Sequence, residues 1–341
     1  SIPVWCAATP CSEILQSAWG KGLNTENAQA SALMEAIERF HSENPDETKL
    51  RRTSMRKLKS EGKRTINPDN LPLYKSSSFF SEDFVVHWTK ARDIVAGNEV
   101  WIPASSVYVC SPMLYGYSAN GLAGGNHMAE ALLHALCEVI ERDSVAGLLS
   151  GGKLKLTPAN SSIIRTDTTE DEAVSALAGL LDKASIKLVL IHLHSIVPVH
   201  TFWAVFLDSN AVQPYTRVNI GYGAHLHPSI AAVRAITEAA QGRITYLHGT
   251  REDMTARMSR PDTSRIEHVY RFFDRLTPDT DWRTLENRAT DDIESDCRNI
   301  RRWLKNAGCT SIITTRLSRE PWNIPVVKVF VPGLKMKKGL F

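Results

Sequence analysis

One short helical signature occurs three times in this chain, at intervals of about 100 residues. Its copies occupy residues 32–39, 135–142 and 235–241, and their first acids are Glu35, Glu138 and Glu238. An alanine stands seven positions before each of these acids, and a glycine precedes each signature. Matches at several aligned columns are hard to obtain by chance, so we expect three related helices.

Each signature places acidic or amide side chains on one face of its helix. Residues three apart are neighbours on a helix, and like charges there repel by roughly a few tenths of a kcal/mol. With about 100° of turn per residue, Glu35 and Glu38 lie about 60° apart, and Glu138 and Glu141 repeat that spacing. Facing helices of this kind require arginines, protons or hard divalent cations such as Mg²⁺. One copy would be typical of a solvated surface, whereas three copies beside small alanines favour packed helices.

These motifs resemble those of the YcaO-domain family, the ATP-dependent enzymes that activate peptide backbone amides. The blocks that carry the resemblance are residues 20–22, 31–39, 118–126, 130–131, 138–143 and 221–223, then Glu238, Gln241, Arg243 and the closing strand at residues 325–334. The resemblance runs from about Pro3 to Leu334 and therefore covers nearly the whole chain.

The resemblance implies an ATP site in which glutamates on helices bind magnesium and the metal ions carry the triphosphate. Its implied cofactors are ATP and Mg²⁺. The implied cofactor-binding residues are Lys21, Ser31, Glu35, Glu38, Asn126, Glu130, Glu138, Glu141, Arg142, Gln241 and Arg243, and the implied metal ligands are Glu35, Glu38, Glu138 and Glu141. The sequence contains no Walker, dinucleotide-binding or protein-kinase motif.

Two of these assignments have a plainer alternative. Residues 20–22 suit phosphate, because glycines, a lysine and a helix N-terminus all favour an anion. They equally suit a simple turn into a helix that Thr25 or Asn27 caps. The third signature replaces its second acid by Gln241 and displaces its arginine to Arg243, so its residues either orient the site or support packing.

The resemblance implies activation of a peptide backbone amide by ATP-dependent O-phosphorylation, followed by attack of a nucleophile. In the family, a neighbouring side chain gives an azoline, sulfide gives a thioamide and an amine gives an amidine. The sequence ends at Phe341 without the proline-rich tail of many azoline-forming members, and we expect no fused leader-peptide-binding domain. We therefore expect the stand-alone type, a homodimer that forms a thioamide in a precursor peptide or protein with a TfuA-like partner.

Two alternatives remain open, and the catalytic residues stay unassigned. The first alternative is an azoline-forming cyclodehydratase. The second is a non-catalytic accessory factor that binds nucleotide or peptide. In such a factor we would expect the acidic residues of the signatures to be replaced. Both acids of the first two signatures are present, together with Ser31 and Arg142.

Composition sets further limits. With 341 residues, of which 43% are hydrophobic and 23% charged, the chain can bury a sizeable core. A net charge of +3 is too small to suggest nucleic acid, and no aromatic residues interleave with the basic run at residues 51–64. The six cysteines lack paired spacing, which predicts a reducing cytoplasm. No apolar run approaches about 18 residues and no signal-peptide pattern opens the chain, so no membrane span is indicated.

Hydrophobic periodicity predicts alternating helices and strands. Helices are expected at about 23–43, 171–184, 228–247, 265–276 and 290–306, a glycine-rich loop and helix at 118–149, and strands at 84–88, 99–102, 187–192, 201–207, 216–221, 311–315 and 326–331. Residues 96–98 read as a hairpin turn and about 44–70 as a variable connection. The fold class is α+β, one domain over 1–341, with antiparallel sheets supporting helices that converge on an acidic ATP cleft.

Two smaller features complete the sequence-based expectations. The opening residues 1–5 resemble a point inside the family's first strand, so we expect that native residues precede them. The pairs His192/His194 and His225/His227 are each two residues apart, which puts each pair on one strand face. No third ligand with zinc spacing follows, so we predict structural histidines, magnesium and no zinc.

Overall fold

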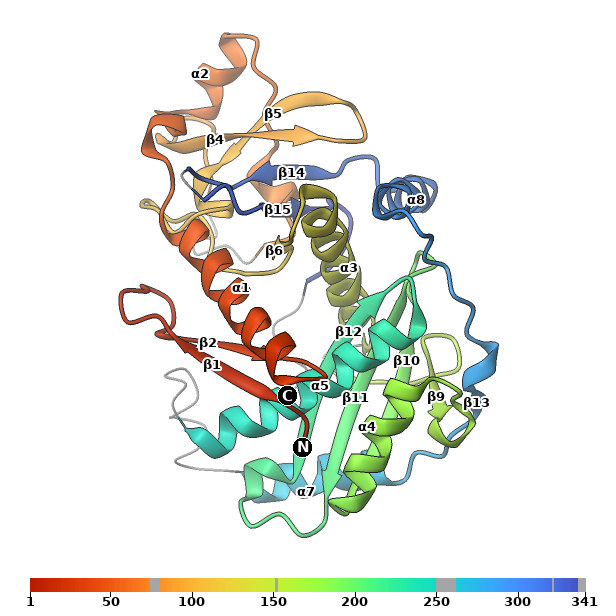
Figure 1. The fold of residues 1–341 in the computed structure, drawn as a ribbon. Helices are drawn as coiled ribbons and strands as arrows, with labels where there is room; N and C mark the ends of the chain where they lie inside the picture. The colour runs from red at the N-terminus through yellow and green to blue at the C-terminus, as the bar shows by residue number, and fades with distance from the viewer. Residues whose placement is uncertain (74–79, 151–152, 250–261, 321, 337–341) are drawn as a thin grey trace. The chain divides into compact units, whose positions relative to one another are not determined.

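The computed structural model describes residues 1–73, 80–150, 153–249, 262–320 and 322–336 (Figure 1). The backbone divides into two compact units. Unit 1 comprises residues 1–36 and 147–289, and unit 2 comprises residues 37–146 and 290–341. A single domain over 1–341 stays a prediction, and the chain end at Phe341 lies outside the described residues.

Unit 1 combines a mainly antiparallel sheet with the helices that cover it. Its strands are β1 (Val4–Ala8), β2 (Ser17–Lys21), β7 (Leu149–Ser150), β8 (Lys153–Leu154), β9 (Ser161–Arg165), β10 (Ile186–Leu193), β11 (His200–Asp208), β12 (Val218–His225) and β13 (Thr280–Asp281). Its helices are α4 (Glu172–Lys183), α5 (Pro228–His248), α7 (Thr263–Asp274) and the part of α1 (Thr25–Glu43) up to Ala36. The main sheet has the order β12-β11-β10-β9-β13, in which only the β13–β9 pair is parallel among the described strands.

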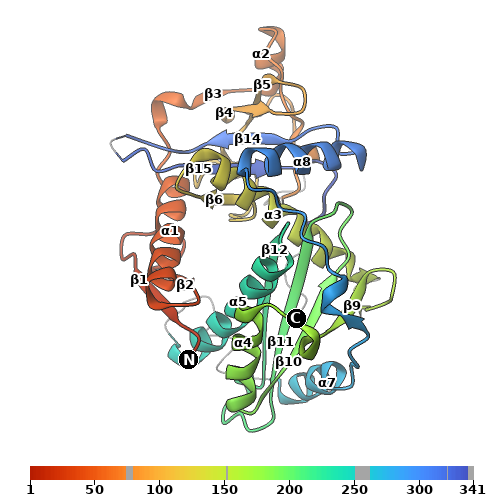
Figure 2. The ribbon, with the colours of Figure 1, turned by 45° about the vertical axis from the view of Figure 1, so that its right-hand side comes forward.

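Strand β11, an interior strand of this sheet, is covered on both faces, and every one of its residues is buried. Alternate residues of a strand point to opposite faces. Phe202 packs in one apolar cluster with side chains of α4 and α5, whereas the ring of Trp203 meets Phe273 of α7 edge to face at 5.0 Å. Figure 2 shows α4 and α5 on one face of this sheet and α7 on the other.

Strand glycines explain the alanines of the repeated signature. A Cβ atom at Gly221 of β12 would lie 2.2 Å from the backbone nitrogen of Ala239, and one at Gly20 of β2 would lie 2.1 Å from that of Ala32. Both alanines are fully buried. Each of these strands therefore packs directly against the backbone of its motif helix, and the small residues on both sides make that approach possible.

Unit 2 is built on a second antiparallel sheet. Its strands are β3 (Arg51–Thr53), β4 (Val86–Asp93), β5 (Asn98–Pro103), β6 (Leu122–Gly124), β14 (Ile313–Arg316) and β15 (Val326–Phe330), and its helices are α2 (Met55–Ser60), α3 (Met128–Gly147), α8 (Ile293–Asn306) and the remainder of α1. The order is β3-β4-β14-β15-β6, with β5 paired to β4. An apolar cluster that includes Ile102, Ile313 and Phe330 forms a core on this sheet.

The predicted α+β class with antiparallel sheets is confirmed, and so are the predicted helices and strands to within a few residues. The expected hairpin joins β4 to β5, with Gly97 at φ +75°. The connection at 44–70 is more ordered than expected, because it contains β3 and α2. Ser54 caps α2, whose Met55 and Leu58 are buried in a stretch that is otherwise charged. Two apolar residues among many polar ones are too weak a periodic signal to predict a short helix.

The cysteines and the helix lengths relate to the expected reducing environment and the expected lack of a membrane span. Each of the six cysteines is a free thiol. None of the helices in the described part of the chain has the length and apolar character needed to cross a membrane.

Candidate functional site

In unit 2, acids from two of the motif helices reach the same short strand. Glu38 of α1 accepts a hydrogen bond from the backbone N–H of Gly124 at 2.5 Å. Glu138 of α3 accepts one from the backbone N–H of Gly121 at 3.1 Å. These two glycines bracket β6 and lie about 10 Å apart at about 3.3 Å per residue. The fold therefore brings one acid from the first signature and one from the second to opposite ends of one strand.

The second signature also places a buried acid and an arginine beside Glu138. Glu141 is only 6% exposed. The guanidinium of Arg142 lies 3.7 Å from a carboxylate oxygen of Glu138 and 3.9 Å from one of Glu141. One arginine at these distances balances two acids only in part. The second signature therefore brings two acids and one arginine together in unit 2, and the acidic metal site that the sequence predicts stays a prediction.

Lys328 of β15 contributes a positive charge that sequence reasoning missed. Its side chain is 1% exposed, and its ammonium group donates to the carbonyl oxygen of Ser118 at 2.5 Å. Burial lowers the pKa of Lys328 to about 8, against the opposing effect of the negative charge of Glu138. The loop before β6 is thus held by Lys328 at Ser118 and by Glu138 at Gly121. A lysine inside the apolar run of β15 was the available signal, since a buried charge needs partners.

Asn126 and Glu130 lie together where α3 begins. The backbone N–H and the side-chain amide of Asn126 both donate to one carboxylate oxygen of Glu130, at 2.9 and 3.0 Å. The backbone N–H of Glu130 in turn donates to His127 at 3.3 Å. These contacts satisfy donors at a helix start, and the acid suits the positive end of the helix dipole. Binding of cofactor by Asn126 and Glu130 stays a prediction.

In unit 1, residues of the third signature bind β2. Lys21 forms an ion pair with Glu238, and the other carboxylate oxygen of Glu238 accepts the backbone N–H of Tyr222 at 3.2 Å. The side-chain amide of Gln241 donates to the carbonyl oxygen of Trp19 at 3.0 Å. The structure therefore brings Lys21, Glu238 and Gln241 together at the contact between β2 and α5.

Arg243 makes the contacts expected of a packing residue. It donates to the carboxylate of Asp208 at 2.6 Å and to the carbonyl oxygen of Thr216 at 2.7 Å. The Asp208 side chain is 9% exposed. These bonds join α5 to the end of β11, which corresponds to one of the two roles that the sequence left open. A role of Arg243 in cofactor binding stays a prediction.

Ser31 and Glu35 lie on α1 in the part that belongs to unit 1, and both are half-buried. They are four residues apart, so they occupy the same helix face one turn from each other. Glu35 and Glu38 are three residues apart on this continuous helix, which agrees with the shared face that the sequence predicts. Their roles in binding nucleotide and metal stay predictions.

The arrangement of the acidic side chains bears on the predicted magnesium site. Within the described residues, no group of three or more histidine, cysteine, aspartate and glutamate side chains is arranged to hold a metal ion. The proposed ligand set of Glu35, Glu38, Glu138 and Glu141 therefore stays a prediction. Its donor chemistry fits, because carboxylate oxygens are the hard ligands that Mg²⁺ prefers.

The histidine pairs are used for local structure. Nε2 of His200 lies 2.7 Å from the carbonyl oxygen of Glu286, which only accepts, so this nitrogen carries a proton. Nδ1 of His200 then accepts from Nε2 of His192 at 3.2 Å. Burial lowers the pKa of His192 to about 3 and also lowers that of His200. In the other pair, His227 caps α5 by accepting the N–H of Ser229 at 3.2 Å.

Comparison with known proteins gives consistent relatives. The family model described as YcaO cyclodehydratase, ATP- and Mg²⁺-binding, matches residues 19–335. An uncharacterized protein of Methanothermobacter thermautotrophicus is 31% identical over 352 residues, with 98% of this chain and 86% of that protein covered. A protein of Rhizobium leguminosarum bv. trifolii, named as lying in the tfuA 3' region, is 30% identical over 351 residues, with 98% and 81% covered.

Solved structures share the fold. The structure of YcaO from Methanopyrus kandleri bound with AMPPCP and Mg²⁺ matches with a TM-score of 0.74 and 22% identity, over 98% of this chain and 85% of that one. A heterocyclase in complex with substrate and cofactor matches with a TM-score of 0.77 and 21% identity over 94% of this chain. This chain spans only 45% of the length of that heterocyclase. At such identities the likeness concerns the fold alone.

Proposed function

The chain belongs to the YcaO family, and on that premise we propose that it is an ATP- and magnesium-dependent enzyme that activates a backbone amide of a peptide or protein. The observation that carries the proposal is the family match over residues 19–335. ATP and Mg²⁺, the cofactors that the sequence predicts, are those in the description of that family.

The chemical requirement is a better leaving group at the amide carbon. Magnesium-bound ATP would supply the phosphoryl group that converts the amide oxygen into a leaving group. In our proposal Glu35, Glu38, Glu138 and Glu141 hold the metal, and Arg142 balances the charge that Glu138 and Glu141 retain. Lys328 keeps the loop at Ser118 in position through its hydrogen bond. A nucleophile then attacks the amide carbon, and phosphate leaves with the original oxygen.

For the nucleophile we propose sulfide, which leaves a thioamide, delivered with the help of a TfuA-like partner protein. This finer assignment is supported by the relative named for the tfuA 3' region, which is 30% identical across 98% of this chain. The proposal includes a homodimeric, cytoplasmic enzyme and a precursor peptide or protein as substrate. Light scattering of the purified chain tests the dimer.

Peptide mass provides the direct test of the reaction. The protein is incubated with magnesium ATP, a candidate precursor peptide, sulfide and the TfuA-like partner. Replacement of oxygen by sulfur is expected. Loss of water would instead identify an azoline-forming cyclodehydratase, and it would overturn the thioamide assignment while leaving amide activation intact. Absence of both product and phosphate release would support the non-catalytic accessory factor.

A further inference from the structure

Helix α8 of unit 2 has one face packed against the core and the other exposed. Cys297, Ile300 and Leu304 are buried, and the thiol of Cys297 donates to the carbonyl oxygen of Ala129 in α3 at 3.4 Å. Because its apolar face is occupied in this way, α8 presents its remaining side chains outward.

The outward face carries four basic side chains in a single patch. Arg301 and Arg302 lie three and four positions after Arg298, and Lys305 lies four and three positions after them. The four side chains are therefore neighbours on the helix surface, and all of them are exposed. Repulsion among like charges at this spacing destabilises a helix. Lys305, in the last turn, gains from the helix dipole, whereas that effect falls off before Arg301 and Arg302.

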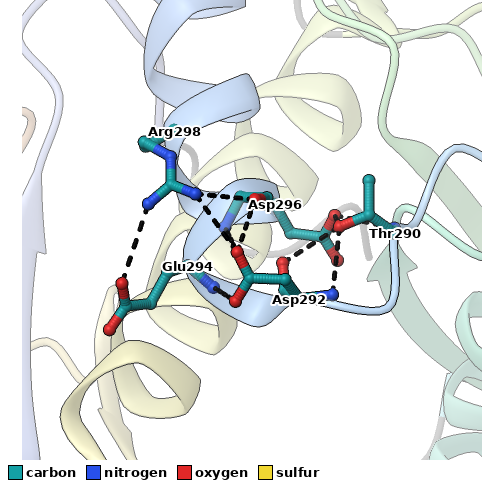
Figure 3. Close-up of polar contacts among 6 residues, drawn as sticks. Thr290, Asp292, Glu294, Asp296 and Arg298 are labelled. Carbon is teal, nitrogen blue, oxygen red and sulfur yellow. Dashed lines mark hydrogen bonds and ion pairs between the residues drawn. The ribbon is translucent and has the colours of Figure 1, made fainter.

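Only one of these four cations is neutralised by acids of the described chain. Figure 3 shows the carboxylates of Asp292 and Glu294 turned toward the guanidinium of Arg298, at 3.1 and 3.7 Å. Among the described residues, no carboxylate forms an ion pair with the other three, which are Arg301, Arg302 and Lys305. The patch therefore retains positive charge that a negatively charged ligand can neutralise.

A fixed turn faces the patch and makes it one side of a groove of about 520 Å³. Ile94 and Val95 line the groove from the turn between β4 and β5. Buried Asp93 holds that turn, because its carboxylate accepts the N–H of Val95 at 3.0 Å and the hydroxyl of Ser311 at 2.7 Å. Arg301 also donates to the carbonyl oxygen of Ile94 at 3.4 Å. Both sides are anchored, so the groove is formed before any ligand arrives.

We propose that this groove binds an acidic, extended segment of the polypeptide substrate. Guanidinium groups match carboxylates in charge and shape, and Ile94 and Val95 offer aliphatic contact to an intervening side chain. The residues that line the groove, all of them described, include no aromatic ring on which a nucleic-acid base could stack. The inference rests on the proposed function, because every residue of a polypeptide has a backbone amide. Selection of a substrate must then come from side chains elsewhere.

Binding of a labelled peptide tests the groove without any nucleotide. The probe is a fluorescein-labelled peptide in which glutamates and aspartates flank a central leucine, followed by fluorescence anisotropy. The variant Arg301→Gln/Arg302→Gln/Lys305→Gln should bind it about 10-fold more weakly, as expected for three lost exposed charge pairs. The control Arg52→Gln/Lys63→Gln/Arg64→Gln removes the same charge from exposed residues of unit 2 outside the groove, and it should bind within about twofold of the parent.

Equal weakening of peptide binding in both triple variants would show that only the net charge of the protein matters, and it would overturn the proposal. Unchanged binding in the groove variant would also overturn it. Inorganic polyphosphate that binds the groove more tightly than the peptide would also overturn it, in favour of a phosphate polyanion. The experiments distinguish failure of this inference from failure of the proposed function. Phosphate release without groove-dependent binding removes only this inference, whereas groove-dependent binding without phosphate release removes the proposed enzyme.

Discussion

The ammonium group of Lys328 donates a hydrogen bond to the carbonyl oxygen of Ser118 from a side chain that is almost entirely buried. Burying a charge is costly unless it is paired and hydrogen-bonded. The carbonyl of Ser118 and the negative charge of Glu138 provide this compensation. Because Glu138 also accepts the N–H of Gly121, one buried lysine and one acid together hold the loop before β6.

Lys328→Met should lower the free energy of unfolding by about 1–3 kcal/mol. The variant leaves the carbonyl of Ser118 without its buried donor and removes one of the positive charges near Glu138, which keeps Arg142 at 3.7 Å. Urea unfolding followed by circular dichroism measures the difference. Lys63→Met changes an exposed lysine of unit 2 and should stay within about 0.5 kcal/mol of the parent. Equal stability of the two variants would contradict a compensated buried charge at Lys328.

Glu138→Gln should abolish ATP turnover while the fold persists, and Glu35→Gln should do the same. An amide is a poor magnesium ligand, and loss of a ligand is expected to cost at least about 100-fold in phosphate release. Phosphate release and thermal melting are compared for each variant. The control Glu99→Gln removes an exposed acid that pairs with Lys90 on the surface of unit 2, and it should turn over normally. Full turnover in both Glu138→Gln and Glu35→Gln would remove these residues from the site.

Much of the fold could be predicted because periodicity is a local property. The alanines at positions 32 and 239 stand within the repeated signature, and the glycines at positions 20 and 221 precede it in the chain, but only the structure reveals their close approach. The apolar runs of β10 and β11 were equally clear, since strands covered on both faces read as continuous hydrophobic segments.

The partners of individual polar side chains could not be predicted, because they depend on residues far away in the chain. Arg243 forms an ion pair with Asp208 on β11, and Lys21 forms one with Glu238 on α5. Lys328 lay in a strand that the sequence identified, but nothing local indicated the carbonyl of Ser118 as its partner. The sequence places Glu38 and Glu138 on helices, whereas their contacts at the two ends of β6 depend on the sheet of unit 2.

Gly221→Ala should destabilise the protein severely, by about 3 kcal/mol or more. The added methyl group would meet the backbone of α5 at 2.2 Å, and a backbone cannot yield as a flexible side chain does. Gly179→Ala is the matched control, because the new methyl group on α4 meets nothing within 4 Å. That control should stabilise the helix by about 0.5–1 kcal/mol. Denaturant unfolding of both variants decides the matter, and a mild effect at Gly221 would mean that β12 and α5 lie farther apart than described.

Acid should destabilise the protein through His192 and His200, which lie side by side on β10 and β11. Burial lowers the pKa of both histidines, that of His192 to about 3. In the unfolded chain a histidine has its ordinary pKa near 6.5, so below that pH the unfolded chain binds protons that the folded protein does not bind. Their contribution to stability is therefore present above about pH 6.5 and is lost as the pH falls toward 3. At pH 5 the loss in the free energy of unfolding from His192 alone is on the order of 2 kcal/mol. His192→Phe, which preserves an aromatic ring beside Phe202, should flatten this dependence, whereas His268→Phe at an exposed position should leave it unchanged. Free energies of unfolding measured between pH 5 and 8 test the prediction, and parallel profiles for the parent and His192→Phe would refute it.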